Sequence, residues 1–511
     1  MESVFSTYVY EGDGTYRDII NGIDLSNEGG MVWVKNRNGT HDHIITDTER
    51  GVNKGLSSSS TGTADTATSR INGFLEDGFS VGNSYKTNNG SGNDYASWTF
   101  RKAPKFFDVV TYTGDGNASQ TISHSLGATV GMLIIKKTSG TEGWYVYHRS
   151  LGNNKALELQ ETVAAYNNVP WGSVTSTTFE ARSDIAGNDS GSTYVAYLFA
   201  HNNNDGDFGS DSDQDIIKCG AATNVNGSGD VFYDLGFEPQ WLLWKQTNTS
   251  RDWYIFDNMR GVATGGADAE LRPSKDDAED AGLDQIDFNA TGFTVRPNMS
   301  GLATNGSSDF IYMAIRRGTK VPESATEVFD VDAYSGNSTA GRIIPSAFPV
   351  DLAIVQSRSA AGDTNAVADR LRGANLLLNI PSADAELTNN SDSITGFDFM
   401  DGIEIGTDTR TNWSSGTYVS WMWKRAPGYF DVVAYTGTGS AMTVSHNLAA
   451  VPEMMWVKSR SNADDWAVYH SALGNTDNLF LNGTNATASR IYWNNTTPTA
   501  IQFSLGNHSK V

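Results

Sequence analysis

The sequence contains a single cysteine, Cys219, so no disulfide bond can form within the chain. It has no run of about 18 apolar residues that could cross a membrane as a helix, and its first residues lack the basic and apolar stretches of a signal peptide. Basic residues are scarce, 36 Lys and Arg against 59 Asp and Glu, which gives a net charge of −23. Because nucleic acid binds basic surfaces, we expect no nucleic-acid partner and no membrane insertion.

Sequence motifs of common catalytic sites are also missing. The chain has no His-Glu-x-x-His, no nucleophile elbow and no phosphate-binding loop. A glycosidase needs only two carboxylates, which no motif reveals, so sequence alone leaves that activity open. We expect a protein that is not an enzyme and has no organic cofactor, since a chain built from similar domains leaves little room for a catalytic one.

What the sequence does contain is one pattern in five head-to-tail copies, with a period of roughly 100–115 residues, which matches one small domain. A polar residue that ends a strand forms the first column: Lys35, Lys136, Lys245, Gln356 and Lys458. The second column is Asp47, His148, Asp257, Asp369 and His470. A glycine follows each of these: Gly51, Gly152, Gly261, Gly373 and Gly474.

The pattern within each copy predicts an all-β fold. Short runs of β-branched and aromatic residues alternate with Gly- and Asn-rich turns, which is typical of a β-sandwich. The sequence therefore predicts a tandem array of five β-sandwich (jelly-roll-like) domains, arranged as beads on a string with interfaces between neighbours. Their expected bounds are 1–103, 104–204, 205–318, 319–426 and 427–511.

The Asp/His column predicts a local structural motif. Where the column holds Asp, an arginine follows three residues later, and where it holds His, a leucine does. We interpret the Asp as the cap of a short turn that also pairs with the arginine. A metal or general-base role is the alternative, but Asp and His would not usually exchange together with a neighbour in such a site. The expected capping pairs are Asp47 with Arg50, Asp257 with Arg260, and Asp369 with Arg372.

An acidic stretch at 202–215 joins the second and third copies. Carboxylates that alternate in a Gly-rich loop can present several oxygens to one Ca²⁺, although the spacing does not fit an EF-hand. A solvated linker is the alternative. The candidate calcium ligands are Asp205, Asp207, Asp211, Asp213 and Asp215.

The final strand of a copy is apolar on both faces, as in the segments 194–200, 310–315 and 418–423. This predicts a central strand covered on both sides, or a face buried against another subunit, and we expect a homo-oligomer, with a trimer as the first model. The fifth copy contains no such strand. Either the sequence is part of a longer protein, or another polypeptide supplies the strand.

Two copies carry motifs that resemble a known domain family. The second contains RKAPKFFDVVTYTGDG, TISHSLG, WYVYHRSLG and TYVAYLFA, and the fifth contains KRAPGYFDVVAYTGTG, TVSHNLAAVPEMMWVKSRS and WAVYHSALGN. They resemble a tandem-repeat β domain of structural proteins in marine bacteriophages, including cyanophages. The resemblance implies a virion protein, such as a tail fibre or another appendage, that contacts other virion proteins and a host surface glycan. The alternatives are an adhesin array on a bacterial surface and a polysaccharide-degrading tailspike.

Overall fold

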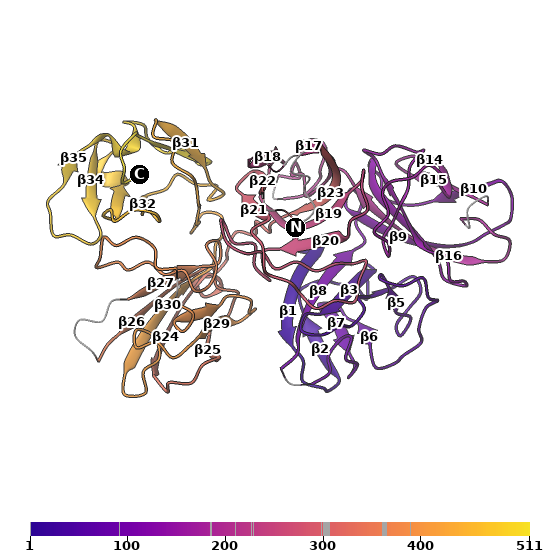
Figure 1. Cartoon of the computed structure of the whole chain (residues 1–511), viewed down its shortest axis with the longest axis horizontal. Helices are drawn as coiled ribbons and strands as arrows, with labels where there is room; N and C mark the ends of the chain where they lie inside the picture. Colours follow the sequence, from indigo (N-terminus) through magenta and orange to yellow (C-terminus); the bar gives the residue numbers. More distant parts are fainter. Residues whose placement is uncertain are drawn as a thin grey trace. The chain divides into compact units, whose positions relative to one another are not determined.

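The computed structural model describes residues 2–90, 92–183, 187–209, 211–225, 227, 229–297, 299, 307–359, 365–388 and 390–511. The fold is all-β, as predicted, and consists of small antiparallel sheets packed in pairs as five sandwiches (Figure 1). In the part of the chain that the structure describes, three 3-10 helices accompany the strands: η1 (Ala325–Glu327), η2 (Ser471–Leu473) and η3 (Ile491–Trp493). Among the described residues, no helix is long and apolar enough to cross a membrane.

The first repeat shows the arrangement that the others follow. One sheet has the order β1-β8-β3-β4-β5 and the other β2-β7-β6. The strands are β1 (Phe5–Glu11), β2 (Arg17–Ile20), β3 (Gly30–Asn36), β4 (Ile44–Asp47), β5 (Leu56–Ser57), β6 (Ile71–Phe74), β7 (Gly78–Val81) and β8 (Asp94–Arg101). Aliphatic side chains of both sheets, together with Phe79 and Tyr95, fill the space between them. Because apolar side chains alternate with polar ones along the strands, the apolar faces of the two sheets form one core in each repeat.

The second and third repeats keep this plan. Repeat 2 has sheets β13-β12-β11-β16-β9 and β10-β15-β14, and repeat 3 has β17-β23-β19-β20 and β18-β22-β21. The strands of repeat 2 are β9 (Phe107–Thr113), β10 (Ser119–Ser123), β11 (Val130–Lys137), β12 (Trp144–His148), β13 (Leu157–Glu158), β14 (Trp171–Val174), β15 (Thr178–Arg182) and β16 (Thr193–Ala200). Those of repeat 3 are β17 (Ile217–Val225), β18 (Val231–Asp234), β19 (Pro239–Gln246), β20 (Trp253–Asp257), β21 (Ile286–Asn289), β22 (Gly292–Val295) and β23 (Ser308–Arg316).

Repeat 4 is a complete sandwich, with sheets β24-β30-β26-β27 and β25-β29-β28. Its strands are β24 (Phe329–Ser335), β25 (Arg342–Pro345), β26 (Leu352–Ser357), β27 (Ala366–Asp369), β28 (Ile394–Gly396), β29 (Gly402–Ile405) and β30 (Thr417–Trp423). Repeat 5 has β32-β33-β34-β35 and β31-β36. Its strands are β31 (Met442–Ser445), β32 (Met454–Val457), β33 (Ala467–His470), β34 (Asp477–Phe480), β35 (Ala488–Ser489) and β36 (Gln502–Leu505).

The fifth repeat shows what the missing final strand does to the sheet. In the other repeats the first strand pairs only with the final one, as β9 does with β16. In repeat 5 the corresponding residues, 431–438, form no strand, and the described sheets of this repeat contain no strand at the place of β16. The final strand is therefore the element on which the first strand of each repeat depends.

The chain divides into two compact units. Unit 1 contains residues 1–260, 267–287 and 292–318, which is most of repeats 1 to 3, and unit 2 contains 261–266, 288–291 and 319–511. Within unit 1 the structure differs from a string of beads. Repeat 3 returns to contact repeat 1, so the three sandwiches lie around a common centre (Figure 1). The junction at residues 103–107 is short, the one at 202–217 is longer, and hydrogen bonds hold the chain at both.

Candidate functional site: the interdomain arms

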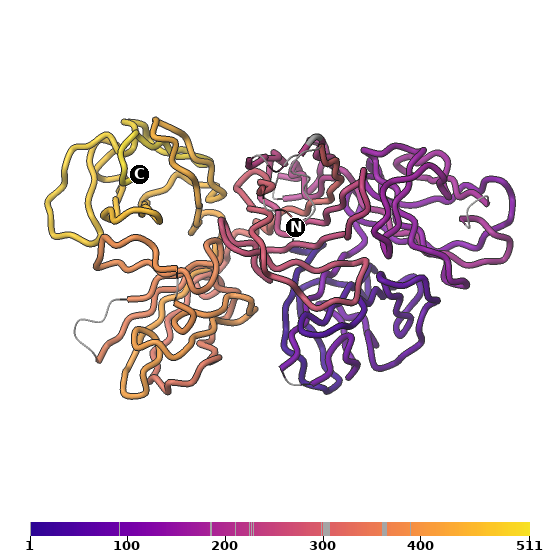
Figure 2. The backbone as a smooth tube through the Cα atoms, viewed as in Figure 1, coloured from indigo at the N-terminus to yellow at the C-terminus, as the bar shows by residue number. Residues whose placement is uncertain are grey.

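One irregular segment in each repeat reaches outward from the sandwich, and we call it the arm. Each arm begins and ends at an antiparallel pair: Gly55 with Asp65, Ala156 with Tyr166, Glu270 with Asp280, Leu377 with Leu387, and Asn478 with Ala488. Between these ends most of the backbone forms no regular structure (Figure 2). Because the arm carbonyls are not used up in a sheet, they are available to another domain.

Arm 1 (55–65) lies on repeat 2. The indole of Trp144 donates from Nε1 to the carbonyls of Ser57 and Ser60, both at 3.0 Å. The ammonium of Lys136 donates to the carbonyl of Thr61 at 3.1 Å. The Trp144 and Lys136 side chains have no measurable exposure, so these bonds are formed away from water.

Arm 2 (156–166) lies on repeat 3 in the same way. Trp253 Nε1 donates to the carbonyl of Glu158 at 2.9 Å, and Lys245 Nζ donates to the carbonyl of Thr162 at 3.1 Å. The backbone N–H of Ala165 also donates to the carbonyl of Thr247 at 2.8 Å. The lysine column of the sequence is thus part of a binding surface for the arm of the preceding domain.

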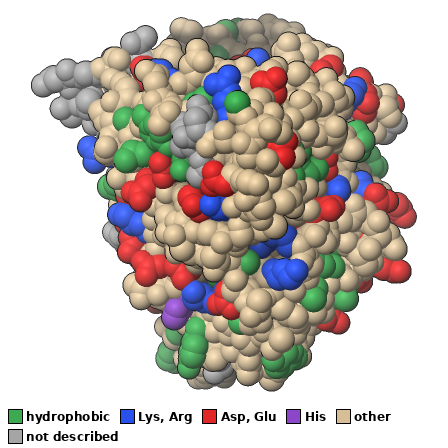
Figure 3. Space-filling view, turned by 90° about the vertical axis from the view of Figure 1, so that its right-hand side faces the viewer, with side chains coloured by type: hydrophobic (Ala, Val, Ile, Leu, Met, Phe, Trp, Pro, Cys, Tyr) green, Lys and Arg blue, Asp and Glu red, His purple; other side chains and the backbone are tan. Residues whose placement is uncertain are grey.

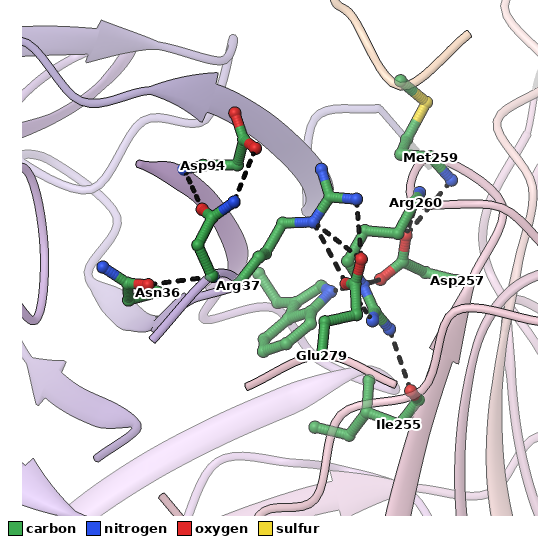
Figure 4. A network of polar contacts seen from close by, with 10 residues as sticks. Asn36, Arg37, Asp94, Ile255, Asp257, Met259, Arg260 and Glu279 are labelled. Atoms are coloured by element: carbon green, nitrogen blue, oxygen red, sulfur yellow. Dashed lines mark hydrogen bonds and ion pairs between the residues drawn. The ribbon is translucent and has the colours of Figure 1, made fainter. Parts of the chain in front are cut away.

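Arm 3 (270–280) returns to repeat 1. The backbone N–H of Glu279 donates to the carbonyl of Arg37 at 2.7 Å, the same bond that Ala165 makes with Thr247. The Glu279 carboxylate lies between two guanidinium groups, 2.7 Å from Arg37 and 2.8 Å from Arg260 (Figure 4). Lys35 Nζ lies 3.4 Å from the carbonyl of Asp276. Each of the first three repeats therefore gives one arm and receives one, which makes unit 1 a closed ring of three domains.

The predicted capping pairs are in contact in all three repeats. The backbone N–H of Arg50, Arg260 and Arg372 donates to the Asp three residues earlier at 2.9 Å, and the guanidinium Nε of each lies 2.5–2.6 Å from the other carboxylate oxygen. The pairs are buried. In repeats 2 and 5 the imidazole Nδ1 of His148 and His470 accepts a backbone N–H instead.

The same column also contacts neighbouring domains, which the sequence did not indicate. Tyr197 of repeat 2 donates its hydroxyl to Asp47 of repeat 1 at 2.7 Å. Trp98 of repeat 1 donates Nε1 to Asp257 of repeat 3 at 3.0 Å. His148 Nε2 lies 3.1 Å from the carbonyl of Tyr312 in repeat 3. In each of the first three repeats the final strand therefore meets the capped turn of another domain, and this explains why β8 and β16 are buried on both faces.

Burial shifts the protonation of these groups. It lowers the pKa of Lys35, Lys136 and Lys245 to about 8, because the charged ammonium loses water. Burial also lowers the pKa of His148 to about 3. For Glu279 burial acts to raise the pKa, but Arg37 and Arg260 outweigh it, so the pKa lies below its usual value. The ring is thus held with Glu279 ionised and His148 neutral near pH 7.

Unit 2 repeats one step of this arrangement. Trp466 Nε1 of repeat 5 donates to the carbonyl of Asn379 in arm 4 (377–387) at 3.0 Å. The backbone N–H of Glu386 donates to the carbonyl of Arg460 at 2.8 Å, and the Glu386 carboxylate pairs with both Arg460 and Arg372 at 2.8 Å. Arm 4 is therefore bound to repeat 5 as arm 3 is to repeat 1.

The five aspartates of the acidic junction are not gathered at one point. Asp215 accepts the backbone N–H groups of Asn204 and Gly206 and lies 3.5 Å from Lys218, while Asp207 pairs with Lys105 at 2.8 Å. No group of three His, Cys, Asp or Glu side chains that could hold a metal occurs among the described residues. Calcium binding by Asp205, Asp207, Asp211, Asp213 and Asp215 stays a prediction.

A surface hollow and a buried cysteine lie outside the arms. An open surface hollow of about 350 Å³ in repeat 1 is lined by Tyr16, Arg17, Asp18, Asn72, Ser80 and Val81. Cys219 is fully buried in β17, and burial raises the pKa of its thiol. Acidic and basic side chains lie interspersed on the face seen in Figure 3. None of these gathers as many buried polar contacts as the arms do.

Comparison with known proteins gives a family. The family model described as a domain of unknown function (DUF7483) matches residues 2–317 and 324–511. The chain belongs to this DUF7483 family. A search of curated proteins found no match. The first stretch matched by the DUF7483 model spans repeats 1 to 3, and the second spans repeats 4 and 5.

Sequence reasoning missed two sets of functional residues in this DUF7483 chain. The tryptophans that bind the arms, Trp144, Trp253 and Trp466, each lie four positions before the Asp/His column. The arm glutamates, Glu279 and Glu386, occur where the capped turn has an arginine and the receiving domain has Arg37 or Arg460. Alignment of the five copies column by column would have shown both.

Proposed function

We propose that the chain is a non-enzymatic structural protein of a marine bacteriophage particle, forming part of a tail fibre or another appendage on the virion surface. Two observations support this proposal. The motifs of repeats 2 and 5 resemble domains of such virion proteins, and the recurrent polar columns of the chain hold one domain to the next. The second observation carries the proposal, because polar columns that recur at the domain contacts of the first three repeats are what an architectural protein requires.

The arms join small domains into one rigid unit. A single sandwich of about 100 residues buries a limited core and is marginally stable. Buried indole, ammonium and carboxylate contacts between sandwiches add stability and fix their relative orientation within unit 1. A rigid block transmits force and presents its outer loops in a defined order, so that several weak contacts to a host surface glycan can act together. Other virion proteins and further copies of the chain, in a trimer, are the partners of this proposal.

Labelling of the particle tests the proposal. Antibodies against the purified chain should decorate the appendages of phage particles from the source community, and the purified chain should bind host cells without changing their polysaccharide. Labelling of bacterial cell walls in the absence of particles would instead identify an adhesin. A fall in the viscosity of host polysaccharide after addition of the purified chain would identify a depolymerase and contradict the proposal.

A further inference from the structure

Unit 2 contains only one of the three arm contacts that close unit 1. Repeat 5 receives arm 4 through Trp466 and Arg460. Among the described residues of unit 2, no backbone hydrogen bond joins an arm to the receiving surface of repeat 4, and none joins arm 5 (478–488) to another domain. Leu481 of arm 5 packs at its base against the apolar cluster of Ile354, Val367, Leu378 and Trp466. Unit 1 is thus a ring of three domains, whereas unit 2 is a pair of domains in which the receiving surface of repeat 4 and the arm of repeat 5 remain open.

The open ends expose apolar side chains whose counterparts are buried. Met454 and Trp456 of β32 are 51% and 42% exposed, whereas Met31 and Trp33, at the same places in β3, are 1% exposed. Repeat 5 lacks a final strand, which accounts for part of this difference. Repeat 4 has its final strand, and still one face of β30 is only partly buried, with Trp421 and Trp423 against the cluster that contains Trp466, whereas both faces of β8 and β16 are buried. A neighbouring domain is what covers the second face in unit 1.

A charged residue marks the same open surface. Arg358 occupies the position of Arg37 and Arg460, each of which binds an arm glutamate. Arg358 is exposed, and its guanidinium has no ion-pair partner among the residues that the structure describes. An arm with a glutamate at the place of Glu279 or Glu386 would complete this site.

Some residue types also recur with a period of three domains, although the arm glutamate and the receiving arginine do not, since Glu386 belongs to arm 4 and Arg460 to repeat 5. Repeats 1 and 4 share the Asp–Arg cap, a receiving arginine and a tryptophan in the final strand, Trp98 or Trp421. Repeats 2 and 5 share the His–Leu cap and the arm-binding tryptophan. The two stretches that the family model matches also separate after the third repeat. A domain of the third type, whose arm carries a glutamate, is the one that this order lacks in unit 2.

We propose that the open surfaces of repeats 4 and 5 bind a third DUF7483-type sandwich domain, so that unit 2 becomes a second closed ring. The arm of this domain binds repeat 4 with a glutamate on Arg358, and its capped turn accepts the indole N–H of Trp421, as Asp257 accepts that of Trp98. Its receiving surface binds arm 5. The inference is independent of the proposed function, since it follows from the interface in unit 1.

The test adds such a domain to the full chain. A second copy of residues 188–318 is joined after Val511, because this segment contains the final strand that completes repeat 2 and then the whole of repeat 3. Hydrogen exchange is measured in β30 (417–423), in β32 (454–457) and in both copies of 188–318. The matched control carries Glu279→Lys in the second copy only, and Arg358→Glu is then added to restore the ion pair.

We expect exchange in β30 to slow by about tenfold or more in the extended chain, to become fast again in the control and to slow once more in the restored variant. Exchange in β32 should slow in all three chains, because the added final strand pairs with it whether or not the ring closes. Unchanged exchange in β30 beside a folded second copy would overturn the proposal. A second copy that stays unfolded, while the first copy in the same molecule is protected, would overturn it as well. Protection that grows with the concentration of the original chain would show that another copy of the chain is the occupant, which also contradicts it.

Discussion

Arg37 and Glu279 lie 242 residues apart in the sequence and form an ion pair of 2.7 Å between largely buried side chains. The first belongs to repeat 1 and the second to the arm of repeat 3. Since Glu279 also pairs with Arg260, one carboxylate joins the capped turn of its own domain to the receiving surface of another. This pairing closes the ring and turns three small sandwiches into one unit.

The exchange of Asp–Arg for His–Leu can be tested in repeat 1. Asp47→His alone should destabilise unit 1 by roughly 3–5 kcal/mol, because the buried Arg50 loses its carboxylate. Adding Arg50→Leu should recover most of this loss, since repeats 2 and 5 use that combination and arm 1 has alanine at the place of Glu279. Urea unfolding of both variants measures the difference. Equal losses in the single and double variants would show that the two positions do not act as a pair.

The arm-binding tryptophans contribute a hydrogen bond that phenylalanine cannot make. Trp253→Phe should destabilise the ring by roughly 1 kcal/mol, because the carbonyl of Glu158 loses the indole donor and keeps only the backbone N–H of Glu161 at 3.3 Å. Arm 2 should then exchange its amide hydrogens faster than arms 1 and 3. Trp413→Phe is the control, since Trp413 is 51% exposed and no arm bond of its indole is seen. If the amide hydrogens of arm 2 exchange at the same rate in both variants, the indole N–H of Trp253 does not hold the arm.

The buried lysines predict that stability rises with pH over an alkaline window. Their folded pKa of about 8 lies below the unfolded value of 10.5, so between these values the unfolded chain binds more protons and stability increases with pH. Ionisation of tyrosines in the unfolded chain, near pH 10, acts in the opposite direction, so the gain should be seen from about pH 8 to 10. Thermal unfolding at several pH values measures it. Lys136→Met should reduce the slope, and an unchanged slope would mean that this lysine keeps an ordinary pKa.

The sandwich fold could be predicted from sequence because it rests on local signals. Alternating strands, Gly- and Asn-rich turns and the Asp-to-Arg spacing all act within a few residues. The cap at Asp257 was predicted for the same reason, but its contact with Trp98 was not, since the two residues come together only when repeat 3 meets repeat 1. A cap alone is worth about 1 kcal/mol, whereas the buried cluster is worth more.

The ring could not be predicted because domain order in sequence does not fix domain order in space. A tandem repeat favours contacts between neighbours in sequence. The return of repeat 3 to repeat 1 depends instead on the path of the junctions and on the pairing of Glu279 with Arg37. The doubly apolar final strand did indicate burial of a second face. The covering surface in unit 1 is another domain of the same chain, which leaves the predicted homo-oligomer as a separate question.

The most direct test of the closed ring is a double-mutant cycle between the two residues that close it. The free energy of unfolding of unit 1 is measured for Arg37→Met, for Glu279→Gln and for both together. If repeat 3 binds repeat 1 as the structure has it, the two substitutions should couple by roughly 1–3 kcal/mol, although 242 residues separate them. A linear string of domains keeps the two residues apart, and a coupling energy below about 0.3 kcal/mol would contradict the ring.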